Sequence, residues 1–221
     1  MIPKHLFHFL QELTANNNRE WFQANKKAYE LSKSAIEDFI KELITGVQSF
    51  DDSVVGITPK DCMFRINRDV RFSNDKSPYK TNIGGFIAKG GRNAMNAGYY
   101  LHIEPGKSFL GGGIYLPPAD KLKMIRNEIY FNAPTFKKII TDTTFKKYFT
   151  EIWDDAKLKN APKDFPKDFV DIDLLKFKNY TIIHPLKDEQ IMQANFYQYV
   201  LDVFKAMFSL NSFLNHAISN G

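Results

Sequence analysis

The sequence predicts an α+β fold, in which an antiparallel β-sheet from the middle of the chain packs against N-terminal and C-terminal helices. Apolar residues recur at helical spacing in roughly the first 50 residues and again near the C-terminus. In between, from about residue 54 to residue 116, short β-like runs alternate with turn residues. No sharp change of composition divides the 221 residues, so we expect one domain over residues 1–221.

Two helices are expected in the N-terminal region. The apolar residues of the first share one face: Leu6, Phe9, Leu10 and Leu13. Asn16-Asn17-Asn18 then interrupts the pattern and supplies an N-cap for a second, longer helix. The apolar stripe of this longer helix consists of Phe22, Tyr29, Ile36, Phe39, Ile40, Leu43 and Val47. It is expected to end near Gly46 and Asp51-Asp52-Ser53.

The middle of the chain is expected to supply strands at residues 62–66, 83–88, 98–104 and 108–116. The last two runs flank Pro105-Gly106, which suits the central positions of a type II turn. We therefore expect an antiparallel hairpin in which His102 lies opposite Phe109 and Tyr100 lies opposite Gly111.

The two faces of this hairpin differ because successive side chains point to opposite sides of a strand. The apolar face, which should meet helices, carries Tyr99, Leu101, Ile103, Leu110, Ile114 and Leu116. The other face carries Tyr100, His102, Glu104, Lys107, Phe109, Gly111, Gly113 and Tyr115. Glycine in a strand often marks the close approach of a ligand or of another backbone. Gly111-Gly112-Gly113 is thus a second candidate site feature, and close packing of a helix or ring explains it equally well.

The C-terminal part is expected to be mostly helical. Pro117-Pro118 suits a helix start, and residues 134–149 should form one or two short helices. Residues 151–170 combine prolines with many charges, which is typical of an irregular surface segment. A late strand is expected at residues 180–184 and a final helix at about residues 187–208.

The most informative stretch for function is the segment of residues 65–82. It places three arginines and two lysines among hydrogen-bonding residues and two aromatic rings. Residues 60–92 hold eight basic and three acidic side chains, and the resulting net charge of +5 equals that of the whole chain. An excess confined to one short region favours a focused anion site over a diffuse basic surface.

The predicted ligand is therefore an anionic small molecule, such as a phosphorylated or carboxylated one. Arginine suits bidentate recognition of phosphate and carboxylate groups, and lysine adds a point charge. The predicted ligand-binding residues are Arg65, Arg68, Arg71, Lys76, Tyr79, Lys80, Asn82, Tyr100 and Gly111. Acid–base chemistry of a hydrolase or transferase type would fall to Asp69, Asp75 or His102. The sequence does not decide whether the protein is an enzyme.

Three alternatives stay open at this point. Asp69 and Asp75 could each pair with an arginine, which would make the segment an internal ion-pair network. Basic residues interleaved with Phe72, Tyr79 and Phe86 also suit nucleic-acid binding. A non-enzymatic module that docks an acidic partner is the third alternative.

Three groups of motifs occur together in this chain. They are Asn18-Arg19-Glu20-Trp21-Phe22; Arg68-Asp69-Val70-Arg71-Phe72-Ser73 with Asp75-Lys76-Ser77-Pro78-Tyr79-Lys80-Thr81; and Tyr100-Leu101-His102-Ile103-Glu104-Pro105-Gly106 followed by Gly111-Gly112-Gly113. In these motifs the chain resembles, over most of its length, the domain-of-unknown-function 2461 family of bacterial and fungal proteins. Members of that family often carry histidine after the Lys-Thr pair, where this chain has Asn82. The resemblance implies where the site lies and implies no reaction.

Several other site classes are disfavoured. Gly85-Phe86-Ile87-Ala88-Lys89-Gly90 has the glycine spacing of a phosphate loop, but Gly91-Arg92 replaces the required Lys and Ser/Thr. His5 and His8 lack further ligands, and His102 with Glu104 makes only a pair, so no metal site is predicted. Cys62 begins an apolar run and is expected to be a small buried residue. The sequence identifies no cofactor.

The compartment and partners are predicted only coarsely. One cysteine, no secretion signal and no apolar run of about 18 residues predict a cytoplasmic protein without a membrane partner. The oligomeric state is not determined by the sequence.

Overall fold

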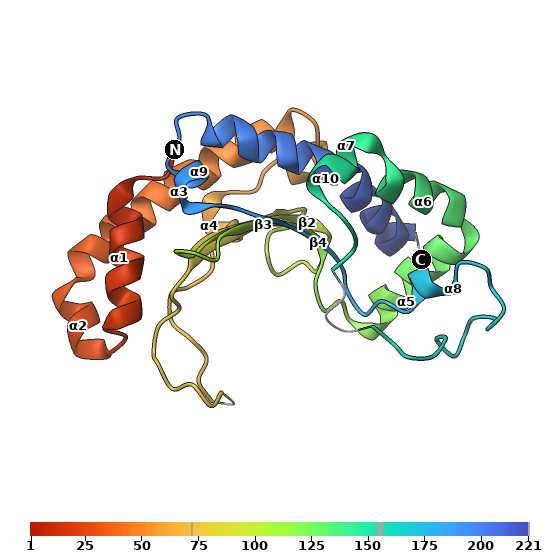
Figure 1. Ribbon diagram of the computed structural model, residues 1–221, viewed down its shortest axis with the longest axis horizontal. Helices are drawn as coiled ribbons and strands as arrows, with labels where there is room; N and C mark the ends of the chain where they lie inside the picture. Colours follow the sequence, from red (N-terminus) through yellow and green to blue (C-terminus); the bar gives the residue numbers. More distant parts are fainter. Residues whose placement is uncertain (72, 154–156, 221) are drawn as a thin grey trace.

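The four-stranded sheet lies in the middle of the molecule and carries helices over one of its faces (Figure 1). The computed structural model describes residues 1–71, 73–153 and 157–220. Within these residues four strands form one antiparallel sheet in the order β1-β2-β3-β4. The strands are β1 (Ile83–Ala88), β2 (Gly98–Ile103), β3 (Phe109–Ile114) and β4 (Tyr180–Pro185). The α+β class and the antiparallel sheet predicted from the sequence are confirmed.

The N-terminal region is helical as expected, with one additional break. It forms α1 (Lys4–Ala15), α2 (Arg19–Ala24) and α3 (Lys26–Gln48). Asn18 caps α2, because its side chain accepts a hydrogen bond from the Trp21 N–H. The expected single helix after Asn18 is divided at Asn25, whose side-chain amide donates to the Trp21 carbonyl oxygen at 2.9 Å. Such local side-chain hydrogen bonds compete with the helical backbone pattern.

The expected strand at residues 62–66 is wrong. Cys62 is instead the last residue of the short helix α4 (Pro59–Cys62), which follows the 3₁₀ turn η1 (Asp52–Val54). The Asp61 carboxylate accepts hydrogen bonds from the backbone N–H and the hydroxyl of Thr58, which stabilises this helical turn. In the described residues, this stretch is joined to the sheet by an isolated bridge between Met63 and Gly85.

The predicted hairpin of β2 and β3 is confirmed with its register. His102 pairs with Phe109 and Tyr100 pairs with Gly111. Gly106 has a φ of 75°, as position i+2 of a type II turn requires, and the Lys107 N–H donates to the Glu104 carbonyl oxygen at 2.9 Å. The apolar face is buried as expected except for Leu116, which lies beyond the end of β3 and is 58% exposed.

The long helix α10 (Phe196–Asn220) packs against this apolar face. A Cβ atom at Gly112 would lie 2.6 Å from the Met207 sulfur, so a larger residue there would force the Met207 side chain to move. Asn211, which is fully buried, donates to the Gly98 carbonyl oxygen at 3.0 Å and accepts from the Gly113 N–H at 2.8 Å. It therefore joins α10 to both β2 and β3.

The remaining helices lie beside the sheet. They are α5 (Ala119–Phe131), α6 (Ala133–Thr141), α7 (Thr143–Tyr148), α8 (Ile172–Leu175) and α9 (Asp188–Ile191). The single helix expected at residues 187–208 is interrupted between α9 and α10, and α10 continues well beyond residue 208. The expected irregular segment at residues 151–170 has no regular element in its described residues, and residues 154–156 lie outside them.

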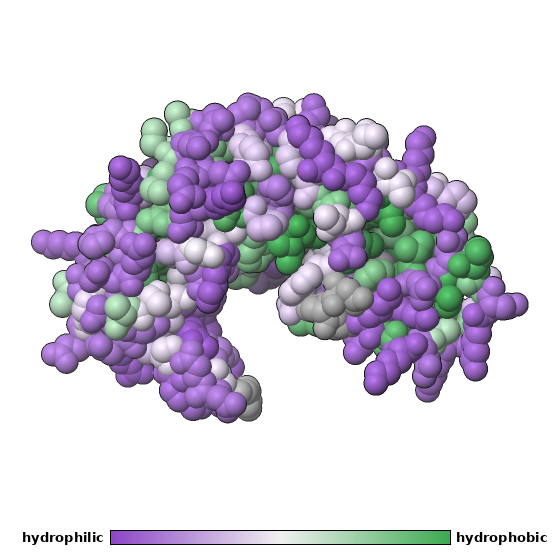
Figure 2. Space-filling model, viewed as in Figure 1, coloured by the Kyte–Doolittle hydropathy of each residue, from purple (hydrophilic) through white to green (hydrophobic). Residues whose placement is uncertain are grey.

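The opposite face of the sheet is open and is flanked by two arms (Figure 1). One arm is the segment of residues 65–82, which extends away from the sheet, and the other is formed around α5 and α8. Figure 2 shows the molecule hollowed between these arms, with hydrophobic residues along the top of the hollow. In the described parts of the chain, none of the helices combines the length and apolar character needed to cross a membrane.

The buried contacts of Asn211 give the first testable prediction. Asn211→Ala leaves one backbone N–H and one carbonyl group buried without a partner, which should lower the free energy of unfolding by about 2–4 kcal/mol. Urea denaturation followed by circular dichroism measures this change. Asn220→Ala, at the exposed end of the same helix, serves as the control and should change stability by less than about 0.5 kcal/mol. Equal losses in the two variants would contradict the role assigned to Asn211.

Candidate functional site

Side chains on the open face of the sheet form the site. Alternation along β2 places Tyr100 and His102 on this face, and the register places Phe109 and Gly111 opposite them on β3. Gly111 in turn pairs with Ile183 on β4. The polar hairpin face predicted from the sequence is thus the face that the helices leave uncovered.

A chain of hydrogen bonds runs along the outer part of this face. The Tyr100 hydroxyl lies 3.0 Å from Nδ1 of His102, and Nε2 of the same ring lies 3.1 Å from the Glu104 carboxylate. The other oxygen of Glu104 accepts a hydrogen bond from the Thr81 hydroxyl at 2.8 Å. The His102 ring also stacks on Phe109, with ring centroids 4.6 Å apart. The imidazole is therefore held on both nitrogens and on one face.

Burial shifts the pKa values of His102 and Tyr100 in this chain of hydrogen bonds. It lowers the pKa of His102 below its usual range, although the hydrogen bond to Glu104 acts in the opposite direction. Burial, together with the nearby Glu104 charge, raises the pKa of Tyr100 to about 12. Near neutral pH the tyrosine thus keeps its proton, and the imidazole favours its uncharged form.

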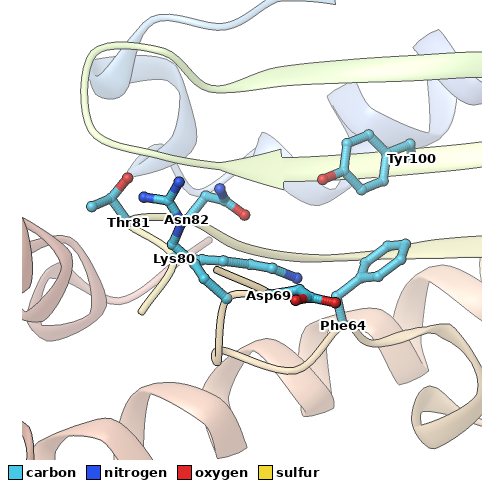
Figure 3. Close-up of a pocket in the computed structure, with 7 residues that line it drawn as sticks. Phe64, Asp69, Lys80, Thr81, Asn82 and Tyr100 are labelled. Atoms are coloured by element: carbon cyan, nitrogen blue, oxygen red, sulfur yellow. The ribbon is translucent and has the colours of Figure 1, made fainter. Parts of the chain in front are cut away.

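A polar cleft of about 500 Å³ adjoins Tyr100, whose hydroxyl is one end of the hydrogen-bonded chain. Besides Phe64, its lining residues come from the segment of residues 65–82 and from β2: Arg68, Asp69, Lys80, Thr81, Asn82 and Tyr100. In Figure 3 the Lys80 side chain runs along the cleft towards Phe64, and the Tyr100 hydroxyl points over the same space. The Lys80 ammonium lies 5.5 Å from the centre of the Phe64 ring, and burial, followed by the Arg65 charge, lowers its pKa.

Two of the three arginines expected to hold an anion, Arg68 and Arg71, are already paired inside the segment. Arg71 makes two hydrogen bonds to the Asp69 carboxylate, at 2.9 and 2.6 Å. Arg68 forms an ion pair with Asp75 and donates to the Ser77 hydroxyl at 2.8 Å. The internal pairing considered as an alternative is therefore present. It orders a segment whose surface is exposed.

These contacts lower the pKa of both carboxyl groups to about 2. The hydrogen bonds from Arg71 are the main cause at Asp69, whereas those from Ser77, followed by Arg68, are the main cause at Asp75. Both groups are thus fixed anions over the physiological pH range, which does not suit a proton carrier.

The other predicted ligand-binding residues lie in several places. Asn82 lines the cleft, whereas Arg65 borders a neighbouring hollow. The Lys76 ammonium donates to the Val70 carbonyl oxygen at 2.9 Å. Tyr79 is 5% exposed and stacks on Phe22 at 3.9 Å, so it belongs to the core. Gly111 lies on the floor of the open face, and Phe72 lies outside the described residues.

Neither Cys62 nor a cluster of metal-ligating side chains contributes to the site in the described residues. Cys62 is fully buried as expected, and burial followed by the Asp61 charge raises the pKa of its thiol to about 12. Among the residues that the structure describes, no three His, Cys, Asp or Glu side chains gather in a way that could hold a metal ion.

Comparison with known proteins places the chain in a family. Residues 5–213 match the family model described as conserved hypothetical protein (DUF2461). The chain belongs to the DUF2461 family. No curated protein and no solved structure gives a match. The matched DUF2461 region includes every residue that lines the polar cleft.

Sequence reasoning did not select several residues of this DUF2461 site. Glu104 and Thr81 complete the hydrogen-bonded chain, and the two-residue spacing of Tyr100, His102 and Glu104 was a signal that could have joined all three. Phe64 was hidden in the run expected to be a strand. No local signal marks Thr181 and Trp153, which reach the same face from much later in the chain.

The hydrogen bond between His102 and Glu104 gives the second testable prediction. Because the negative charge of Glu104 stabilises protonated His102, Glu104→Gln should lower the pKa of His102 further. An NMR titration of the histidine ring resonances measures this pKa. Glu12→Gln, which removes an exposed carboxylate on α1, is the matched control and should leave the pKa of His102 unchanged. An unchanged or raised value in Glu104→Gln would contradict the arrangement.

Proposed function

We propose that the polar cleft binds an anionic small molecule, phosphorylated or carboxylated, and that Tyr100 exchanges a proton with it through His102. The observation that carries this proposal is the coincidence, in one cleft, of the Lys80 ammonium and the Tyr100 end of the hydrogen-bonded chain. The cleft thus offers both a positive charge and a group that can carry a proton.

Lys80 is the cation best suited to hold the anion. Its ammonium is partly buried, and in the described residues no carboxylate lies within ion-pair distance of it. A buried ammonium is stabilised by an opposite charge, so an anion in the cleft would offset the desolvation that lowers the pKa of Lys80. Arg68 and Arg71 contribute indirectly, since their ion pairs order the segment that carries Lys80.

The order of Tyr100, His102 and Glu104 in the chain of hydrogen bonds supports proton transfer. With ionised Glu104 as the acceptor, Nε2 of His102 carries the hydrogen and Nδ1 accepts the hydrogen of the Tyr100 hydroxyl. In this state Tyr100 accepts a hydrogen bond from the ligand. When His102 is protonated, Nδ1 donates to the Tyr100 oxygen, and the hydroxyl then donates to the ligand. The proposal therefore assigns the acid–base role to His102 with Tyr100 and not to Asp69 or Asp75.

The shape of the surface around Lys80 favours a small molecule over the alternatives. A nucleic acid or an acidic protein partner would be matched best by a flat or convex basic face, whereas Lys80 lines a concave cleft. Tyr79, one of the rings expected to stack on bases, instead stacks on Phe22 in the core. The cytoplasmic location expected from the sequence stays part of the proposal.

The third testable prediction concerns the anion. If inorganic phosphate at ten times its dissociation constant occupies the cleft, the melting temperature should rise by about 3–6 °C. Lys80→Ala should lose most of this rise, because it removes the cation that faces the ligand. Lys205→Ala removes the same charge from the exposed side of α10 and should retain the rise. A thermal-shift series over small phosphates and carboxylates measures both.

The control variant also separates binding from the general stabilising effect of phosphate salts, which act by exclusion from the protein surface. Equal rises in wild type, Lys80→Ala and Lys205→Ala would contradict the proposal. The same would hold if none of the anions raised the melting temperature of the wild type above that of Lys80→Ala.

A further inference from the structure

A second, apolar hollow adjoins the polar cleft on the open face. This groove has a volume of about 570 Å³ and shares Phe64 and Tyr100 with the cleft. Its walls are largely aromatic, and its floor is the glycine run of β3. A ligand whose anionic group lies beside Lys80 can therefore extend along the sheet into the groove.

Gly111, on the groove floor, is a glycine that the fold itself does not require. A Cβ atom at Gly113 would lie 1.9 Å from the Tyr180 carbonyl oxygen, and one at Gly112 would lie 2.6 Å from the Met207 sulfur. A Cβ atom at Gly111 would meet nothing closer than 3.5 Å, and its backbone is not in the left-handed region. The missing side chain leaves the sheet backbone bare at this point, so a flat group can lie directly on it.

Thr181 supplies a polar group that lacks a partner. It pairs with Gly113 and faces the groove, and only 9% of its surface is exposed. Among the described residues, its buried hydroxyl oxygen has no hydrogen-bond partner. A buried polar group without a partner destabilises a protein, so a ligand that reaches this hydroxyl would supply the missing hydrogen bond.

The far wall of the groove is a pair of exposed aromatic rings. Tyr115 and Trp153 stack with their centroids 6.2 Å apart and their planes inclined by 25°, and both line the groove. They are 54% and 42% exposed, respectively. Aromatic walls and a flat floor together suit a planar ring better than a branched or acyl group.

We infer that the groove binds a planar aromatic ring with a hydrogen-bonding edge, and that this ring belongs to the anion held in the cleft. The inference rests on the proposed function and narrows its ligand class to aryl or heteroaryl phosphates and carboxylates. The ring lies on Gly111, its polar edge meets the Thr181 hydroxyl, and its anionic group meets Lys80.

Binding of matched probes to the full chain tests the inference. Isothermal titration compares inorganic phosphate, 2-naphthyl phosphate and a set of quinolinyl phosphates that differ in the position of the ring nitrogen. The naphthyl ring should raise affinity over inorganic phosphate by about tenfold or more, since it buries apolar surface. At least one quinolinyl isomer should bind about three- to tenfold more tightly than naphthyl phosphate, through one hydrogen bond to Thr181.

Two kinds of variant separate the parts of the groove. Gly111→Ala and the bulkier Gly111→Val should weaken binding of both aryl phosphates by a larger factor than they weaken binding of inorganic phosphate. Thr181→Val keeps the shape but removes the hydroxyl, so it should abolish only the quinolinyl advantage. Because that hydroxyl has no partner in the protein, Thr181→Val should also retain or raise the melting temperature.

The outcomes distinguish this inference from the proposed function. If aryl phosphates bind no more tightly than inorganic phosphate, or bind the Gly111 variants as they bind wild type, the groove does not hold the ring. If no quinolinyl isomer gains affinity, or the gain survives in Thr181→Val, the inferred hydrogen bond between the ring and the Thr181 hydroxyl is wrong. In each case binding of inorganic phosphate that depends on Lys80 would leave the proposed function intact, whereas no anion binding at all would overturn both.

Discussion

The packing of α10 against one face of the sheet is the constraint on which the rest of this structure depends. Gly112 allows the Met207 side chain to approach the strand, and Asn211 joins the helix to the backbones of β2 and β3. This docking buries the apolar side chains of the hairpin and leaves the alternate side chains without a cover. The open face exists because the helices lie on the other one.

Each buried polar group on the open face therefore needs a partner from the sheet, from the flanking arms or from a ligand. Tyr100, His102 and Glu104 satisfy one another along β2, and Thr81 closes this chain from the basic segment. Within that segment Asp75 pairs with Arg68 and Asp69 pairs with Arg71. Among the residues that the structure describes, the Lys80 ammonium lies within ion-pair distance of no carboxylate, and the buried Thr181 hydroxyl has no hydrogen-bond partner. They lie in adjoining hollows, which is why we treat cleft and groove as one binding surface.

Local sequence patterns predicted much of this fold, because the hairpin obeys a simple rule. The alternation of Tyr99 to Ile103, with the turn at Gly106, predicted the register and the two faces, and the structure confirms both. Features that depend on distant contacts were not predictable in this way. Tyr79 looked like an exposed ring in a basic segment, but Phe22 from α2 stacks on it. Thr181 reaches the site through the pairing of β3 with β4, and Trp153 through the hydrogen bond that its backbone N–H donates to the Thr181 carbonyl oxygen; no local pattern reveals either contact. Within the basic segment, composition predicted the charges, whereas only geometry shows which of them pair with one another.

The proposed anion site lies between Lys80 and Tyr100 at the open face of the sheet. The most direct test is a crystal structure of the protein soaked with tungstate, a heavy analogue of phosphate that anomalous scattering locates without ambiguity. We expect a tungstate ion in the polar cleft, within hydrogen-bonding distance of the Lys80 ammonium and the Tyr100 hydroxyl, and we expect Lys80→Ala to lose it. Tungstate bound only at exposed lysines outside the cleft, with the cleft accessible to solvent in the crystal, would contradict the proposed site.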